Sequence, residues 1–260
     1  VTSGASYNYT VGLGGTGHAC LSQENLWVYY SAQEFGSHDV GDVIVTVHDL
    51  SGDRKHDLQG SVGNAKKTTS ASDGPAINFT NVQLLTSTPI RPHGNEETVY
   101  IVAAFDTHHP GHTSSIIGLG NIWSITAANV DESLYLKMTV KNSESAQLVI
   151  NASSQSQIYV LRRGADGTIL DAYDYTSTDR LSRAQSGPLP EEIDVLTKDK
   201  LWIGCDLACL DSQHFFLGTI SSLAIYKTFH DEDEVHDTIE YLINSNRSDS
   251  QGGKSKFGSL

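Results

Sequence analysis

Strict alternation of apolar and polar residues is the feature that most limits how this chain can fold. Across residues 134–140 the sequence LYLKMTV places an apolar side chain at every second position. Successive side chains of a strand point to opposite faces, so this segment predicts a strand with one face in a core and the other in water. Other strand-like runs, separated by turn residues, occur at Leu26–Tyr30, Val43–Val47, Pro75–Thr80, Thr98–Asp106, Gln147–Ala152, Gln157–Arg163, Lys200–Cys205 and Phe215–Tyr226. We therefore predict an all-β chain, folded as a two-sheet antiparallel jelly-roll sandwich.

One segment near the end of the chain has helical spacing instead. Val235, Ile239, Leu242 and Ile243 would share one face of a helix over Asp231–Ser245. Acidic residues fill the first turn, where the helix dipole favours negative charge. The sequence predicts one short C-terminal helix packed on the sandwich.

The length and composition predict a single folded domain between two ends of different character. A sandwich of 260 residues with 38% hydrophobic residues can bury a substantial core as one domain. The first 19 residues are rich in Gly, Ser and Thr, and the last 14 are polar without periodicity. We predict an N-terminal arm over 1–19, the sandwich over 20–246 and a flexible tail over 247–260.

The arm carries its own strand pattern. Tyr7, Tyr9, Val11 and Leu13 recur at every second position, which is the period of a strand. Two interpretations stay open: an ordinary edge strand of its own sandwich, or a strand donated to a neighbouring copy. Because head-to-tail donation that does not close produces filaments, the second predicts a homopolymer.

The charge of the chain excludes some partners. Lys and Arg total 17 against 31 Asp and Glu, giving a net charge of −14, which opposes binding to nucleic acid and to anionic membranes. The longest apolar runs, such as Val99–Phe105, have the length of strands and not of membrane spans. The chain begins at Val1 without a leader pattern, so a signal peptide has either been removed or never existed, and this start favours a secreted or cell-surface protein.

Four Asn-X-Ser/Thr sequons support an extracellular location, where they would be N-glycosylated. They begin at Asn8, Asn78, Asn151 and Asn246. The second alternates with Ile77 and Phe79, and the third follows Leu148 and Ile150, so a strand would turn both asparagines away from the core.

The three cysteines are Cys20, Cys205 and Cys209. An odd number leaves one thiol over in an oxidising compartment, and the closely spaced Cys205 and Cys209 are the predicted disulfide. The alternative is that all three are small buried apolar residues. A single C-x3-C pair predicts no zinc site.

Three blocks resemble the laminin G-like branch of the concanavalin A-like lectin and glucanase superfamily. At the end of the chain, the block 201–204 (LWIG) and then 215–226 (FFLGTISSLAIY), followed by an acidic helix start, is similar to the closing run of that family. Near the front, 47–52 (VHDLSG) with Asp57 and Leu58, and then 74–79 (GPAINF), resemble its Asp-Leu-Ser-Gly element and the following strand. The resemblance implies a two-sheet sandwich that binds carbohydrate or glycoprotein.

The pair Glu192 and Asp194 is the one pattern that suggests catalysis, and it is incomplete. Laminarinase-like hydrolases of the superfamily carry E-x-D-x-x-E or E-x-D-x-E on a strand, and here Glu192 and Asp194 lack the second Glu. A retaining glycosidase needs two carboxyl groups about 5 Å apart. We therefore expect a non-enzyme, with a polysaccharide hydrolase as an alternative.

Aromatic and acidic residues define the expected sugar site. Trp123, Asp171, Tyr173 and Tyr175 combine ring platforms with a carboxylate, although tyrosine in a strand is also an ordinary sheet former. The histidines of 108–112 (HHPGH) are interpreted as a turn, with a metal or sugar contact as the alternative. No metal site or cofactor is predicted, but calcium held by oxygen ligands stays open.

The sequence thus predicts an extracellular recognition or adhesion module without catalysis, which binds glycans or glycoproteins. The first alternative is a structural subunit of an extracellular filament, linked through the arm. The second is the hydrolase.

Overall fold

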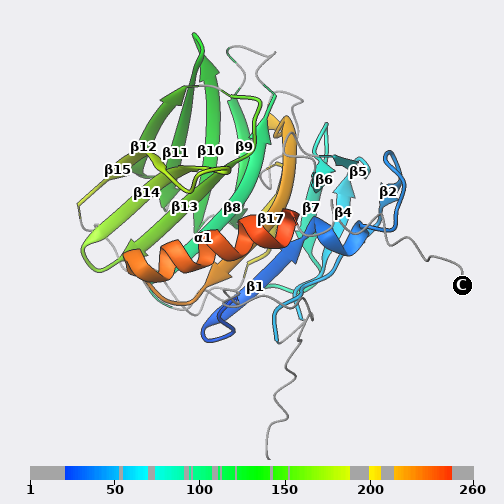
Figure 1. The fold of residues 1–260 in the computed structure, drawn as a ribbon, viewed down its shortest axis with the longest axis horizontal. Coiled ribbons are helices and arrows are strands. Elements are labelled where there is room, and N and C mark those ends of the chain that lie inside the picture. The colour runs from blue at the N-terminus through cyan, green and yellow to red at the C-terminus, as the bar shows by residue number, and fades with distance from the viewer. Residues whose placement is uncertain are drawn as a thin grey trace, which may run out of the picture.

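Two antiparallel sheets pack face to face, and one helix lies on the outside (Figure 1). The computed structural model describes residues 21–52, 55–69, 74–90, 94, 96–106, 111, 113–120, 122–140, 143–151, 153–187, 199–205 and 214–247. Within them the strand pairs of both sheets are antiparallel, which confirms the predicted all-β sandwich.

The first sheet, sheet A, contains nine of the described strands. From edge to edge its order is β15 (Arg180–Gln185), β14 (Gly167–Asp174), β13 (Gln157–Gly164), β8 (Glu97–Phe105), β17 (Gly218–Tyr226), β6 (Pro75–Asn78), β5 (Ala65–Thr69) and β2 (Val43–Ile44), with β1 (Leu26–Ser31) also paired to β17. A short 3-10 helix, η1 (Ala32–Phe35), follows β1.

Sheet B contains eight of the described strands. Its order is β12 (Ser143–Asn151), β11 (Ser133–Val140), β10 (Trp123–Val130), β9 (Thr113–Leu119), β16 (Leu201–Ile203), β7 (Gln83–Thr86), β4 (Leu58–Val62) and β3 (Thr46–Val47).

The core between the sheets follows from the alternation in the sequence. Leu134, Leu136, Met138 and Val140 of β11 are all buried, while the side chains between them are only half-buried. They belong to one apolar cluster with inward residues of sheet A such as Ile101. Full burial of each such side chain contributes about 1.5–3 kcal/mol.

The predicted helix is present as α1 (Glu232–Arg247) and covers the outer face of sheet A (Figure 1). Its apolar face, which includes Val235 and Ile239, packs in a second cluster with Tyr100 and Tyr226 of the sheet. Asp231 and Glu234 cap the first turn reciprocally, because each carboxylate accepts the backbone N–H of the other residue at 2.9 Å.

The segment 43–47, predicted as one strand, divides between the two sheets. Val43 and Ile44 form the edge strand of sheet A, and Thr46 and Val47 form the edge strand of sheet B. Val45 lies between them with 74% of its surface exposed. The alternation alone did not show this change of sheet, because both halves have high β-propensity.

Candidate functional site

The outer face of sheet B carries a row-by-row array of hydrogen-bonding side chains, which we call the polar face. The name refers to Ser124 and Thr126 of β10, Tyr135, Lys137 and Thr139 of β11, and Gln147 of β12. They are the alternate residues of strands whose other residues fill the core. Gln147 is exposed and the other five are half-buried. Ser133 and Asn151, and the apolar Ala128, Val130 and Val149, lie on the same side of the sheet.

The strand register places these groups in rows across the sheet. Thr126, Lys137 and Gln147 are direct cross-strand neighbours, and Ser124 lies opposite Thr139 with its hydroxyl 2.7 Å from the threonine hydroxyl. Neighbouring strands are about 4.8 Å apart, so donors and acceptors recur at short, regular intervals. Hydroxyl and amide groups both donate and accept, and the Tyr135 ring adds an apolar surface with a polar tip. Such a face suits a ligand with many hydroxyl groups.

A second polar cluster forms around the Asp-Leu-Ser-Gly loop. Asp49 is buried, and its carboxylate accepts the backbone N–H groups of Tyr29, Ser51, Lys55 and His56 at 3.0–3.2 Å. These four bonds tie the loop to β1, which gives Asp49 a structural role. They fix the position of the neighbouring residue His48.

Two further carboxylates meet on this loop, and we call them, with His48, the carboxylate cluster. Glu34 Oε1 accepts the backbone N–H of His48 at 3.0 Å, and Asp57 Oδ1 accepts that of Asp49 at 2.9 Å. Asp57 Oδ2 also lies 3.1 Å from Nδ1 of His48, whose side chain is 63% exposed. Burial, and then the charge of Asp57, raises the pKa of Glu34 despite its bond to the His48 N–H. The carboxylates of Glu34 and Asp57 therefore bind the two successive backbone N–H groups of His48 and Asp49. Burial favours the protonated form of Glu34.

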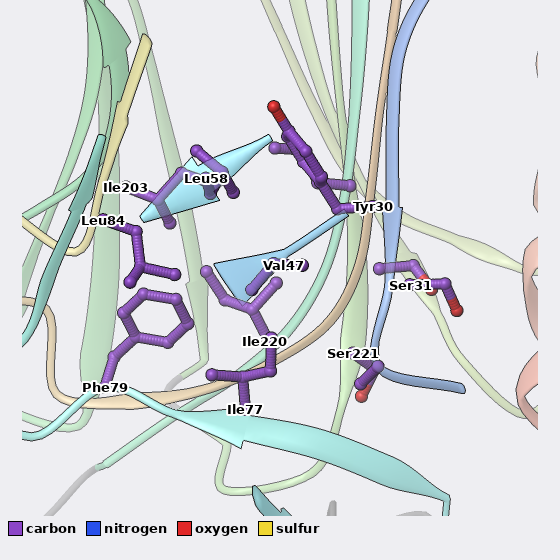
Figure 2. Close-up of a pocket in the computed structure, with 13 residues that line it drawn as sticks. Tyr30, Ser31, Val47, Leu58, Ile77, Phe79, Leu84, Ile203, Ile220 and Ser221 are labelled. Carbon is purple, nitrogen blue, oxygen red and sulfur yellow. The ribbon is translucent and has the colours of Figure 1, made fainter. Parts of the chain in front are cut away.

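An internal cavity lies close to this cluster, between the sheets (Figure 2). It measures about 20 Å³ and is lined mainly by apolar side chains such as Phe79, Leu84 and Ile220. Tyr30 also lines it and donates its hydroxyl to the His56 carbonyl, and burial followed by the charges of Asp49 and Asp57 raises the pKa of Tyr30. A cavity of this size holds about one water molecule and no sugar.

The residues predicted to bind sugar lie elsewhere and are buried. Trp123 belongs to the core between the sheets, and Tyr173 and Tyr175 lie in the cluster that includes the apolar face of α1. Asp171 has no exposed surface. Trp123 is covered by the opposite sheet, and Tyr173 and Tyr175 are covered by α1 on the outer face of sheet A. These residues therefore form no exposed aromatic platform.

Asp171 instead belongs to a network of charges beneath the start of α1. It accepts from Arg162 Nη2 at 2.8 Å and from Arg183 Nε and Nη2 at 2.6 and 2.9 Å. Both arginines also reach Glu232 in the first helical turn, at 2.8 and 2.7 Å. Partial burial alone would raise the pKa of Glu232, but these arginines outweigh it and lower that pKa to about 2. The network fastens the helix to sheet A.

The other predicted sites are described only in part. Asn151 is exposed at the end of β12, and Asn78 is half-buried at the end of β6. The side chain of Asn246, and all of Asn8, lie outside the described residues, as do Tyr7, Tyr9, Val11 and Leu13 of the arm, Glu192 and Asp194. Cys205 is disulfide-bonded. Because Cys20 and Cys209 also lie outside the described residues, the pairing of Cys205 with Cys209 remains a prediction.

Neither a cluster of metal ligands nor a helix that could span a membrane occurs among the described residues. No group of three or more His, Cys, Asp and Glu side chains among them is arranged to hold a metal ion. No helix in the described part of the chain is long and apolar enough to cross a membrane.

Comparison with known proteins shows the fold. No protein-family model matches the sequence, and no curated protein is significantly similar to it. An arabinofuranosidase solved with arabinofuranosyl-α-1,2-xylobiose has a TM-score of 0.56 at 11% identity, over 78% of this chain and 51% of its own. Domain 4 of AbnA, an extracellular GH43 arabinanase from Geobacillus stearothermophilus solved with arabinotriose, has a TM-score of 0.54 at 14% identity, over 83% of this chain and 98% of that domain. A Trypanosoma rangeli sialidase has a TM-score of 0.54 at 13% identity, over 86% of this chain and 33% of its own.

This β-sandwich is thus one that occurs in carbohydrate-binding and carbohydrate-processing proteins. The chain spans about half the length of the arabinofuranosidases that it matches. The comparisons correct the expectation that the chain is not an enzyme, since several proteins that share its fold are glycoside hydrolases. The missing second Glu after Asp194 was therefore no ground for excluding catalysis.

Proposed function

We propose that this chain is an extracellular carbohydrate-binding domain of the laminin G-like type, and that glycans bind on the polar face of sheet B. The observation that carries the proposal is the array of hydroxyl, amide, phenol and ammonium groups held in register on β10, β11 and β12. The shared fold adds support, because Domain 4 of AbnA, solved with arabinotriose, and the binding domain of botulinum neurotoxin DC, solved with SialylT, have the same type of sandwich.

The charge of the face also favours a neutral or acidic sugar as ligand. Lys137 is the charged residue of the polar face among the described side chains. It contributes a positive charge to this face, although the chain as a whole has a net charge of −14. A lysine among hydroxyl groups can pair with a sugar carboxylate or donate to several sugar oxygens. We therefore expect binding of arabino-oligosaccharides or sialylated oligosaccharides, the ligand classes of the neighbours.

The test is titration calorimetry with arabinotriose and with a sialylated oligosaccharide, after a glycan-array screen. Tyr135→Ala should weaken binding at least tenfold, which corresponds to about 1.4 kcal/mol, because it removes the ring on which a sugar would pack. Thr126→Val should weaken it less, since it removes one hydroxyl with little change in shape. Lys66→Ala, at an exposed position in β5 of the other sheet, is the control and should bind as the wild type does. Equal affinity of all four proteins would refute the assignment of the polar face.

Hydrolysis of a glycosidic bond is a second candidate function, and the carboxylate cluster is the observation that favours it. Glycosidases need one carboxyl group that stays protonated to donate to the leaving oxygen and a second that stays ionised. Burial favours the protonated form of Glu34, and the partner would be Asp57, whose side chain is 34% exposed. Asp57 would act as nucleophile or would activate water, and the anomeric form of the product distinguishes the two.

This second function is tested by reducing-sugar release from arabinan and xylan, and by cleavage of aryl arabinofuranosides and sialosides. Glu34→Gln and Asp57→Asn should each remove activity, whereas Glu24→Gln at an exposed position should not. Activity that survives both substitutions would show that the cluster is structural.

A further inference from the structure

The sequon at Asn151 lies next to the polar face. Asn151 is the last residue of β12, and the register pairs it with Ser133 at the start of β11. Its side chain is exposed, while Leu148 and Ile150 on the opposite face are buried. Because side chains two apart share a face, Asn151 points to the same side of sheet B as Gln147 and Val149.

Among the described residues, the hydroxyl proton of the third residue of this sequon is not used in a hydrogen bond. Ser153 is half-buried, and its oxygen accepts the backbone N–H of Gln155 at 3.1 Å. A hydroxyl that accepts one bond can still donate its proton. In the sequon at Asn78, by contrast, the Thr80 hydroxyl already donates to Asn78 Oδ1 at 2.7 Å, and Asn78 is half-buried on β6 between its partner strands β5 and β17. Asn151 is the more accessible acceptor of the two.

Exposed apolar surface lies beside Asn151. Val149 is 46% exposed, and Leu181 on the edge strand β15 is 47% exposed. The two edges meet here, since the hydroxyl of Ser182 lies 3.4 Å from the Val149 carbonyl oxygen. A bulky polar group on Asn151 would shield this seam between the sheets from other proteins.

We propose that Asn151 carries an N-linked glycan, and that this glycan partly covers the polar face and so limits access of external glycans. In the transfer, the side-chain amide nitrogen of Asn151 bonds to C1 of a lipid-linked oligosaccharide. The bond from C1 to the polyprenyl diphosphate breaks, the diphosphate leaves, and the amide nitrogen loses a proton. Four residues of extended strand separate Asn151 from Gln147, which is about 14 Å, a distance that a branched oligosaccharide spans.

The two parts of the proposal depend on different things. Occupancy of Asn151 rests on its exposure, on the sequon and on the proposed extracellular location, and it does not depend on what the polar face binds. The effect on access rests on the proposed function, since it requires that the polar face binds glycans. The experiment separates them by measuring mass first and binding second.

The full chain is secreted from a eukaryotic cell line, and its intact mass is measured before and after treatment with an amidase that releases N-glycans. Asn151→Gln and Ser153→Ala should each remove one glycan mass, while Asn78→Gln should leave the glycan on Asn151 in peptide maps. A wild-type chain without a glycan on Asn151 would overturn the proposal.

Binding is then measured for the wild type, Asn151→Gln and Asn78→Gln on the same glycan array. Asn151→Gln should bind several-fold more tightly than Asn78→Gln, because only the first uncovers the polar face. Equal binding by the two variants would overturn the effect on access and leave occupancy standing. If a fully deglycosylated chain binds no glycan on the array, the proposed function fails, and the effect on access fails with it.

Discussion

Replacement of Asp171 by asparagine should destabilise the fold strongly, although the sequence pattern predicted this residue in a sugar site. The carboxylate is fully buried and accepts three hydrogen bonds from two arginines. Arg162 is also buried, so loss of the carboxylate leaves Glu232, whose side chain is 55% exposed, as its remaining ion-pair partner among the described residues.

The expected cost follows from that geometry. Removal of one partner from a buried ion pair costs about 3–5 kcal/mol, because the other charge is left uncompensated. The remaining bond from Arg162 to Glu232 and the neutral oxygen of the new asparagine favour the lower end, about 3 kcal/mol. For a domain of this size each kcal/mol lowers the melting temperature by about 2–4 °C, so we expect a fall of about 6–12 °C.

The assay is urea unfolding followed by fluorescence, together with calorimetry. Asp179→Asn is the matched control, because it makes the same chemical change at an exposed position close to the same hairpin. If Asp171→Asn costs less than about 1 kcal/mol, no more than the control, the structural role of Asp171 is refuted. Loss of glycan binding without loss of stability would return Asp171 to the sugar site.

Three more perturbations test other parts of the molecule. Because burial raises the pKa of Glu34 above its unfolded value of about 4.3, this group favours folding below its raised pKa and opposes folding as the pH rises through it. Glu34→Gln should therefore match the wild type in urea unfolding at pH 4 and be at least as stable at pH 7, and lower stability only at pH 7 would contradict the assignment. Deletion of residues 1–19 should abolish self-association in light scattering if the arm is donated to a neighbour. Val45→Lys should also abolish it, because a lysine beside the edge strand β2 opposes pairing with a donated strand. Monomeric behaviour of the intact chain would exclude that form of assembly.

Much of the fold was predictable because burial imposes local patterns on strands and helices. The alternation in 134–140 became β11, and the spacing of Val235 and Ile239 became the buried face of α1. Strands with mostly exposed residues were missed, as β4 and β15 show, because only part of each faces the core. The largely buried β9 and β14 were missed as well, because neither shows a clean alternation of apolar and polar residues.

The site was less predictable because it depends on which faces are covered. Tyr173 and Tyr175 have the composition of a sugar platform, and only the position of α1 shows that they are buried. Glu34 and Asp57 are 23 residues apart and meet only when η1 packs near the loop after β3. The alternation of Tyr135, Lys137 and Thr139 did contain part of the polar face, but alternation by itself predicts a strand and not the ligand of its outer side chains.

The order of strands has a consequence for how the protein is made. β16 and β17 lie in the middle of their sheets, yet they are among the last elements to be synthesised, and Leu26 of β1 pairs with Tyr226 of β17. At roughly 5–20 residues per second, a ribosome needs about 10–40 s to supply the partner of β1. During that interval the N-terminal strands have open edges that can pair with other nascent chains. Folding of this domain is therefore expected to be largely post-translational, and its yield to depend on chaperones that hold those edges apart.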